Sequence, residues 1–287
     1  MRALELNDTG LDLRQHPKAR WRLLSALASL VRRWPRSGRV VVLRQEVRLP
    51  GLPPAFDGYR ILHLSDLHVD DGLRADGLLA ALAGCEADLA AFTGDFTIGY
   101  GRSEEAAVAY VGRLLAALRP RCPLILGVRG NSDRPELMPR LARAGLTVLD
   151  NRSLPVSRGG ETIWVAGVDD PHHEADDLGR ALEGVPERAF KVLLAHSPDV
   201  LLRLGGRQVG LILAGHTHGG QVRLPVIGPL VTKTRLPRRF SRGLIRGDGF
   251  CCHVSPGLGG IPLRFRCPPE VAWLTLRSPA CGGPPPC

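Results

Sequence analysis

Short apolar runs alternate with helix-like segments through the middle of this chain, and this alternation restricts it to an α/β fold. The runs that have the character of buried strands cover residues 59–65, 88–94, 123–130, 162–168, 190–197 and 209–215. Helical periodicity lies between them, over residues 77–84, 103–118, 134–144 and 176–183, with Ser103 and Asp133 as candidate N-caps. Strands that alternate with helices indicate one layered α/β domain, which we place at residues 39–277.

Composition supports a globular domain and excludes several other classes. Of the 287 residues, 44% are hydrophobic, which is enough for a sizeable core. No apolar stretch reaches the roughly 20 residues that a membrane-spanning helix needs. The 7 cysteines are an odd number without zinc-type spacing, so we expect buried free thiols and no disulfide framework.

Both ends of the chain differ from this domain. Residues 1–38 form a basic segment in which residues 17–36 carry Trp, Leu and Val at helical spacing among arginines. Acidic residues precede this segment and argue against a signal peptide, so we expect a cytoplasmic protein. The helix either packs on the domain or lies on an anionic membrane as a peripheral contact. Residues 278–287 are predicted to be a disordered tail.

Polar side chains follow five of the predicted strands at the point where each strand ends. They are Asp66 and His68, Asp95, Asn131, His196, and His216 and His218. The carboxyl ends of strands are where α/β sheets place ligands, so we expect these seven side chains to converge. Two residues apart on an extended segment, Asp66 and His68 would point the same way, as would His216 and His218.

The chemistry of this set indicates a pair of divalent cations. Seven side chains provide three or four ligands to each of two ions if one carboxylate binds both. Mixed imidazole and oxygen donors suit Mn, Fe or Zn better than Mg or Ca. A glycine precedes Asp95, Asn131 and His216, which allows a tight turn at each position.

In this order, the motifs resemble those of the calcineurin-like metallophosphoesterases: D-x-H, G-D, G-N-H-[D/E], H and G-H-x-H. The resemblance covers residues 40–277, and LSDLH, AFTGD, LLAHSPD and AGHTHGGQ are similar to a bacterial branch that includes UDP-2,3-diacylglucosamine pyrophosphatases. It implies a four-layer sandwich of two mixed β-sheets flanked by helices. It also implies that Asp66, His68 and His218 hold one metal, that Asn131, His196 and His216 hold the other, and that Asp95 bridges them.

The activity implied is hydrolysis of a phosphodiester or pyrophosphate bond by a hydroxide held between the metals, with Asp95, Asn131 and Ser132 at the reaction centre. Ser132 departs from the family, which usually has His there. Serine is no acid near neutrality, which favours substrates whose leaving group, such as a phosphate, needs little protonation. His172 or His173 could replace the missing acid, or belong to a solvated loop.

Excess positive charge indicates an anionic substrate or surface. Lys and Arg number 38 against 28 Asp and Glu, giving a net charge of +10. A basic group follows residue 219 and comprises Lys233, Arg235, Arg238, Arg239, Arg242 and Arg246. It either grips a second phosphate of a small-molecule or lipid-linked substrate, such as a UDP-sugar lipid, or is a solvated surface run.

Two other functions stay open on the sequence. A nuclease or cyclic-nucleotide phosphodiesterase uses the same metal core, although an aromatic content of 5% offers no stacking platform for nucleic acid. A binding or scaffold protein on the same fold would explain Ser132. Retention of all seven candidate ligands argues against that alternative.

Overall fold

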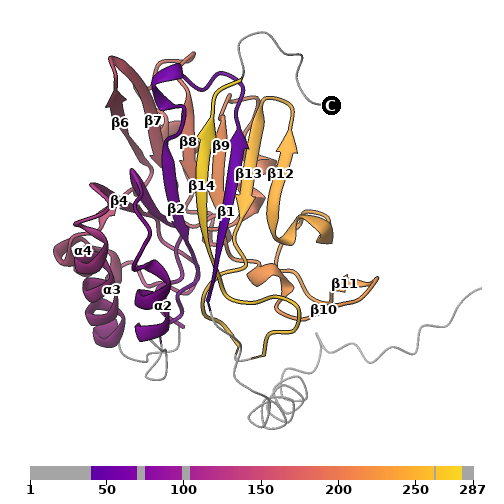
Figure 1. Ribbon diagram of the computed structural model, residues 1–287. Coiled ribbons are helices and arrows are strands. Elements are labelled where there is room, and N and C mark those ends of the chain that lie inside the picture. Colours follow the sequence, from indigo (N-terminus) through magenta and orange to yellow (C-terminus); the bar gives the residue numbers. More distant parts are fainter. Residues whose placement is uncertain (1–39, 70–74, 99–103, 262, 280–287) are drawn as a thin grey trace, which may run out of the picture.

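Two six-stranded mixed sheets pack face to face in the computed structural model, which describes residues 40–69, 75–98, 104–261 and 263–279 (Figure 1). The first sheet runs β1 (Val41–Arg48), β14 (Glu270–Arg277), β2 (Arg60–Leu64), β3 (Leu89–Phe92), β4 (Leu124–Gly127) and β5 (Thr147–Val148). The second runs β12 (Gly243–Gly247), β13 (Phe250–Val254), β9 (Leu211–Ala214), β8 (Lys191–Leu194), β7 (Glu161–Gly167) and β6 (Arg152–Arg158).

Parallel strands form the centre of both sheets. β2, β3 and β4 are parallel in the first sheet, and β7, β8 and β9 are parallel in the second. Antiparallel pairing of β14 with β2, of β6 with β7 and of β12 with β13 makes both sheets mixed. The central strands therefore open their loops at a common edge of each sheet, where ligands bind in such folds.

Helices cover the outer faces of the sandwich and complete its four layers. α2 (Ala75–Leu82), α3 (Glu104–Leu118) and α4 (Leu137–Ala144) pack on the first sheet (Figure 1). α5 (Leu178–Ala181) and the 3₁₀ segment η3 (Pro198–Arg203) pack on the second. Between the sheets, residues such as Ile61, Leu126 and Val192 are fully buried. This confirms the predicted fold class.

Shorter elements connect the layers and extend beyond them. They are η1 (Pro54–Phe56), η2 (Pro171–His173), η4 (His218–Gly220), η5 (Arg238–Ser241) and a small hairpin of β10 (Arg223–Leu224) and β11 (Gly228–Pro229). No helix within the described ranges has both the length and the apolar character to cross a bilayer. The basic segment at 1–38 and residues 280–287 of the predicted tail lie outside the described residues.

All six predicted strands and all four predicted helices occur, with bounds shifted by a few residues. The N-cap role predicted for Asp133 is wrong. α4 is preceded by Glu136, which makes no side-chain cap, and Asp133 is instead buried, accepting hydrogen bonds from the Thr97 and Gly130 N–H groups. Ser103 lies outside the described residues. The five described cysteines are buried free thiols, as expected.

Candidate metal centre

All seven predicted ligands lie at the carboxyl ends of β2, β3, β4, β8 and β9, and they come together in two groups. The first group comprises Asp66, His68, Asp95 and His218, whose ligand atoms lie within 4.8 Å of one another. His68 Nε2 is 3.3 Å from Asp95 Oδ2 and 3.1 Å from His218 Nε2. His218 Nε2 is in turn 3.5 Å from Asp66 Oδ1. These four residues form a metal-binding cluster.

The second group lies on the other side of Asp95. His196 Nε2 is 2.9 Å from Asn131 Oδ1, 3.1 Å from His216 Nδ1 and 3.4 Å from Asp95 Oδ1. The two oxygens of Asp95 therefore face different groups, Oδ2 toward His68 and Oδ1 toward His196.

Backbone contacts show which histidine nitrogens are free to bind a cation. His68 Nδ1 lies 2.9 Å from the Thr97 carbonyl and His196 Nδ1 lies 2.8 Å from the Thr93 carbonyl, so in both rings Nδ1 carries the proton. Each Nε2 faces a carboxylate oxygen of Asp95, His68 Nε2 at 3.3 Å and His196 Nε2 at 3.4 Å. An imidazole nitrogen and a carboxylate oxygen that face each other in this way can bind one divalent cation between them. The donor set therefore fits metal ions.

The electrostatics of the carboxylates follow from burial and from these histidines. Burial raises the pKa of Asp66, although His196 opposes the shift. Burial would also raise the pKa of Asp95, but the charges of His196 and His68 and the Ser132 N–H together hold it below its usual value. Ser132 donates to both oxygens of Asp95, from its N–H at 2.8 Å and from its hydroxyl at 3.1 Å.

The expectation that the ligand pairs lie on extended segments is wrong. Five ligands have left-handed backbone, with φ of 51° at Asp66, 43° at His68, 54° at Asp95, 67° at His216 and 51° at His218. Each strand turns sharply as it ends, so a left-handed residue aims its side chain at the centre while the chain leaves the sheet. Such conformations are sparsely populated and concentrate at functional sites.

The predicted need for glycine before the ligands is confirmed, and its cause is the close approach of neighbouring strand ends. A Cβ on Gly130 would lie 2.2 Å from the Asp95 nitrogen, and a Cβ on Gly215 would lie 1.9 Å from Ser65 Oγ. Only a residue without a side chain allows these loops to pack together.

A buried chain of polar groups leads from between the sheets to Asp66. Ser65 Oγ donates to Asp66 Oδ2 at 2.6 Å, and Thr93 Oγ1 donates to Ser65 Oγ at 2.7 Å. Because the Thr93 hydroxyl proton is used there, His63 Nε2 must donate to Thr93 Oγ1 over 2.9 Å. His63 Nδ1 is then an acceptor, and His253 Nδ1 donates to it over 2.9 Å.

The histidines of this chain are both neutral. Burial holds the pKa of His63 well below its usual value and lowers that of His253 to about 4. His63 is thus a hydrogen-bonded core residue, as its place within a strand predicts. No pattern in the sequence signals His253, because only the pairing of β13 with β9 brings it opposite β2.

A cavity of about 580 Å³ opens beside the second group. Its lining includes Asn131, His216, Asp199, Lys233 and Arg235. The Thr234 hydroxyl and the Arg235 N–H both donate to the Asp199 carboxylate. These hydrogen bonds hold the segment that carries Lys233 and Arg235 at the edge of the cavity. Pro171 and Glu174 also line the cavity, so the loop with the two candidate histidines flanks it. His173 pairs with Asp170, and the side chain of His172 lies outside the described part.

Sequence comparison identifies the family. The calcineurin-like phosphoesterase family matches residues 59–220, a span that contains all seven ligands. The chain belongs to this family. The metallophosphoesterase YkuE of Bacillus subtilis is 30% identical over 79% of this chain and 82% of its own length. The phosphodiesterase YaeI of Escherichia coli is 29% identical over 76% of this chain and 82% of its own. The protein is accordingly a metal-dependent phosphoesterase.

Proposed function

We propose that this phosphoesterase uses two divalent cations to hydrolyse a phosphodiester or pyrophosphate bond. Asp66, His68 and His218 would hold one ion and Asn131, His196 and His216 the other, with Asp95 shared. The observation that carries the proposal is the position of Asp95, whose two oxygens face the two groups at 3.3 and 3.4 Å. Mixed imidazole, amide and carboxylate donors favour Mn, Fe or Zn.

The bound cations would activate water and neutralise charge on the phosphate oxygens. The chain's own residues have separate tasks. Asp95 is oriented by the two donors of Ser132, and Asn131, which would hold one ion through its amide oxygen, also lines the cavity. The Ser132 hydroxyl supplies no acid, which favours a phosphate or another weakly basic leaving group.

The cavity supports a substrate with a second anionic group. Lys233 and Arg235 line the same cavity as Asn131 and His216. A substrate whose first phosphate is held at the metal centre would therefore reach these two basic side chains with a second anionic group. Arginine binds phosphate oxygens with two parallel hydrogen bonds. A nucleotide-sugar diphosphate carrying a lipid, such as a UDP-sugar lipid, has this chemistry.

The proposal is tested by loading the metal-free protein with Mn²⁺ and measuring both the metal content and turnover. The screen would compare phosphomonoesters, phosphodiesters and UDP-sugar lipids by the phosphate species released. We expect two ions per chain and cleavage of diphosphates in preference to monoesters. Asp95→Asn should lose the second ion and nearly all turnover. Uptake of a single ion by the unsubstituted protein would contradict the two-metal assignment.

The alternative functions give different results in the same screen. A nuclease would release nucleotides from DNA or RNA and would lose nucleic-acid affinity steeply as salt rises. A scaffold protein would bind metal without turnover on any ester.

A further inference from the structure

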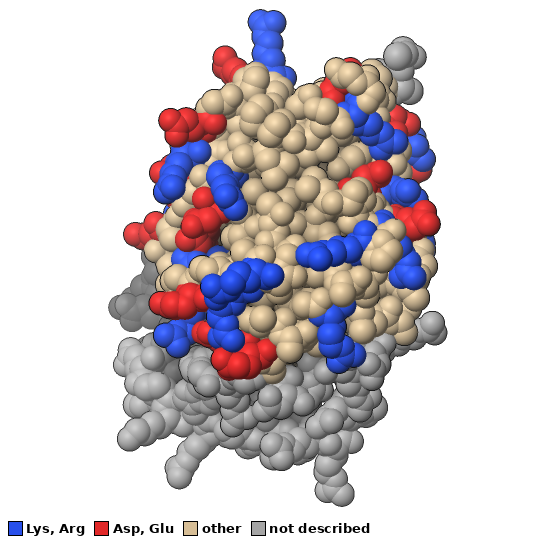
Figure 2. All heavy atoms as spheres, turned by 90° about the vertical axis from the view of Figure 1, so that its left-hand side faces the viewer, with Lys and Arg blue, Asp and Glu red and all other residues tan. Residues whose placement is uncertain are grey.

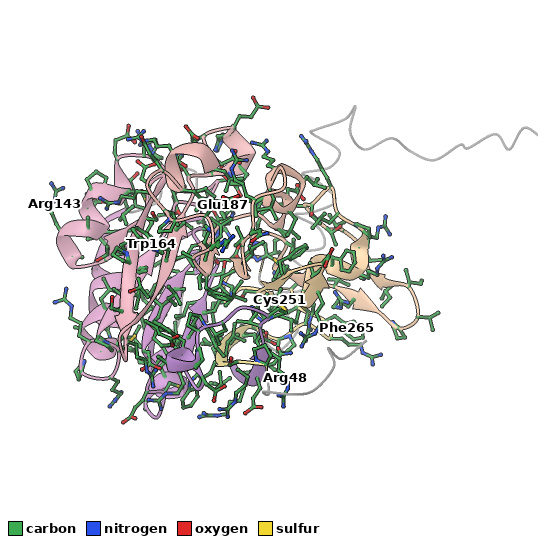
Figure 3. All side chains as sticks on the ribbon, turned by 90° about the horizontal axis from the view of Figure 1, so that it is seen from above. Arg48, Arg143, Trp164, Glu187, Cys251 and Phe265 are labelled. Atoms are coloured by element: carbon green, nitrogen blue, oxygen red, sulfur yellow. The ribbon has the colours of Figure 1, made fainter. Side chains whose placement is uncertain are left out.

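Six large apolar side chains are exposed together beside the metal centre. They lie in the β10–β11 hairpin with its following residues and in a neighbouring segment, and comprise Val226, Ile227, Leu230, Val231, Ile261 and Phe265. We call them the apolar rim. The hairpin projects from the body near η5, and Phe265 lies beside it at the margin of the molecule (Figures 1 and 3). Val226 is fully exposed and Ile227 is 63% exposed. Exposed apolar side chains gathered on two neighbouring segments indicate an interaction surface.

The rim is fastened to the loop that carries the metal ligands. Gln221, three residues after His218, exchanges side-chain hydrogen bonds with the backbone of Ile261, at 2.8 and 3.3 Å. The Phe265 N–H donates to the Gln221 carbonyl at 2.8 Å, and the Arg223 N–H donates to the Phe265 carbonyl at 3.1 Å. Both segments of the rim therefore keep a fixed position relative to the metal centre.

Positive charge predominates in the segments that carry and flank the rim. Their basic residues are Arg223, Lys233, Arg235, Arg238, Arg239, Arg242 and Arg266, and the acidic neighbours are engaged, Asp199 by Thr234 and Arg235 and Glu270 by Arg242. On the face that carries β6 and α4, by contrast, basic and acidic side chains interleave (Figure 2). A partner that matches both features presents an apolar layer together with negatively charged groups.

We propose that the apolar rim inserts into the headgroup region of an anionic lipid layer, with exposed basic residues of the flanking segments, Arg238, Arg239 and Arg266, contacting the lipid phosphates. The tip of the hairpin is aliphatic, whereas the centres of protein interfaces are enriched in Tyr, Trp, Met and Arg. A projecting aliphatic tip backed by cations is the arrangement that binds a fluid surface, which needs no complementary shape.

Docking of the rim would also determine which way the opening of the cavity faces. Lys233 and Arg235 line the cavity and follow Val231 of the rim within four residues. Insertion of the rim would hold the cavity next to the lipid headgroups, from which a membrane-borne phosphate could enter.

Co-sedimentation of the full chain with lipid vesicles tests the proposal. Vesicles of phosphatidylcholine would be compared with vesicles that also contain phosphatidylglycerol, with a chelator present so that no hydrolysis occurs. We expect binding to the anionic vesicles. Val226→Ser with Ile227→Ser should weaken it about tenfold or more, because two apolar side chains no longer enter the lipid. The Tm of this double variant and its turnover of a soluble phosphodiester should equal those of the unsubstituted chain.

A matched pair of charge variants tests the electrostatic part. Arg238→Gln with Arg239→Gln should also weaken binding about tenfold or more. Arg143→Gln with Arg188→Gln removes the same charge elsewhere, and Figure 3 shows Arg143 on α4, on the opposite side from Phe265. This control should bind as the unsubstituted chain does.

Three results would overturn the proposal. The full chain could fail to sediment with anionic vesicles, or the Val226/Ile227 variant could bind them as well as before, which would assign the binding to another part of the chain. Light scattering could instead show that this variant changes the oligomeric mass, which would make a second copy of the chain the occupant of the rim. Since sedimentation requires no hydrolysis, each result leaves the proposed phosphoesterase activity standing.

Discussion

At the scale of single residues, we predict that Ser132 biases this centre toward substrates with a weakly basic leaving group. Its two hydrogen bonds orient Asp95, so it contributes to the geometry of the centre even though it cannot supply an acid. Its side chain is partly exposed at the border of the centre. A larger side chain at this position therefore has room to reach toward a bound substrate.

Ser132→His should raise turnover of simple alkyl phosphodiesters by up to about 10² to 10⁴-fold, because an imidazole can protonate an alkoxide leaving group. Turnover of nucleotide-sugar diphosphates should change much less, since a phosphate leaving group needs little protonation. Steady-state kcat on both substrates measures the difference, with Ser132→Ala as the control. Equal effects on the two substrates would contradict our interpretation of this residue.

Thr93→Val should weaken Mn²⁺ binding by about 10- to 100-fold, because it cuts the chain of donors that ends on Asp66 while keeping the shape of the side chain. The Thr93 carbonyl that orients His196 is retained. Calorimetric titration of the metal-free protein gives the affinity. Thr162→Val, which removes the exposed hydroxyl contact between Thr162 and Ser157, is the matched control and should have no effect.

At the scale of elements, the centre depends on how closely the loops after the strands approach one another. The loop after β9 passes directly over the end of β2, so a Cβ on Gly215 would lie 1.9 Å from Ser65 Oγ and 2.4 Å from Asp66 Oδ2. The ends of β3 and β4 approach as closely at Gly94 and Gly130. These contacts hold the ligands in place before any ion binds.

Gly215→Ala should therefore lower both stability and metal affinity, the former by about 1 to 3 kcal/mol as expected for overpacking. Urea unfolding of the metal-free protein and metal titration measure the two effects. Gly84→Ala is the control, because a Cβ there meets no atom within 4 Å. If the two substitutions behaved alike, the close approach of the loops would not matter for the centre.

At the scale of the whole molecule, the sandwich buries two neutral histidines between its sheets, and this links its stability to pH. The pKa of His253 is lowered to about 4 from an ordinary value of 6.5, through burial. Below pH 6.5 the unfolded chain takes up a proton that the folded chain refuses until near pH 4. Stability is therefore full above pH 6.5 and falls as the pH is lowered.

From this one group the loss at pH 5 should be about 2 kcal/mol relative to pH 7. Urea unfolding of the metal-free protein at both pH values measures it. In His253→Gln the loss between the two values should be smaller by about that amount, because glutamine does not titrate. An unchanged loss in the variant would show that His253 does not stay neutral in the fold.

The sequence by itself determined the alternating α/β architecture and the seven candidate ligands. Both follow from local patterns: apolar runs of strand length and polar residues directly after them. The outer strands were less visible, because β1, β6 and β12 are partly exposed edge strands without a continuous apolar run, and β1 pairs with the distant β14. Asp133 was misassigned for a related reason, since its backbone partner Thr97 belongs to another loop.

Tertiary structure alone decided the geometry of the centre. The left-handed turns at Asp66 and His216, the two-sided position of Asp95 and the link from His253 to Asp66 all depend on contacts between residues far apart in the chain. The rim beside the centre is of the same kind, because Gln221 joins two segments that only the folded chain brings together. Local pattern names the groups that can bind, whereas packing between distant segments fixes their distances and directions.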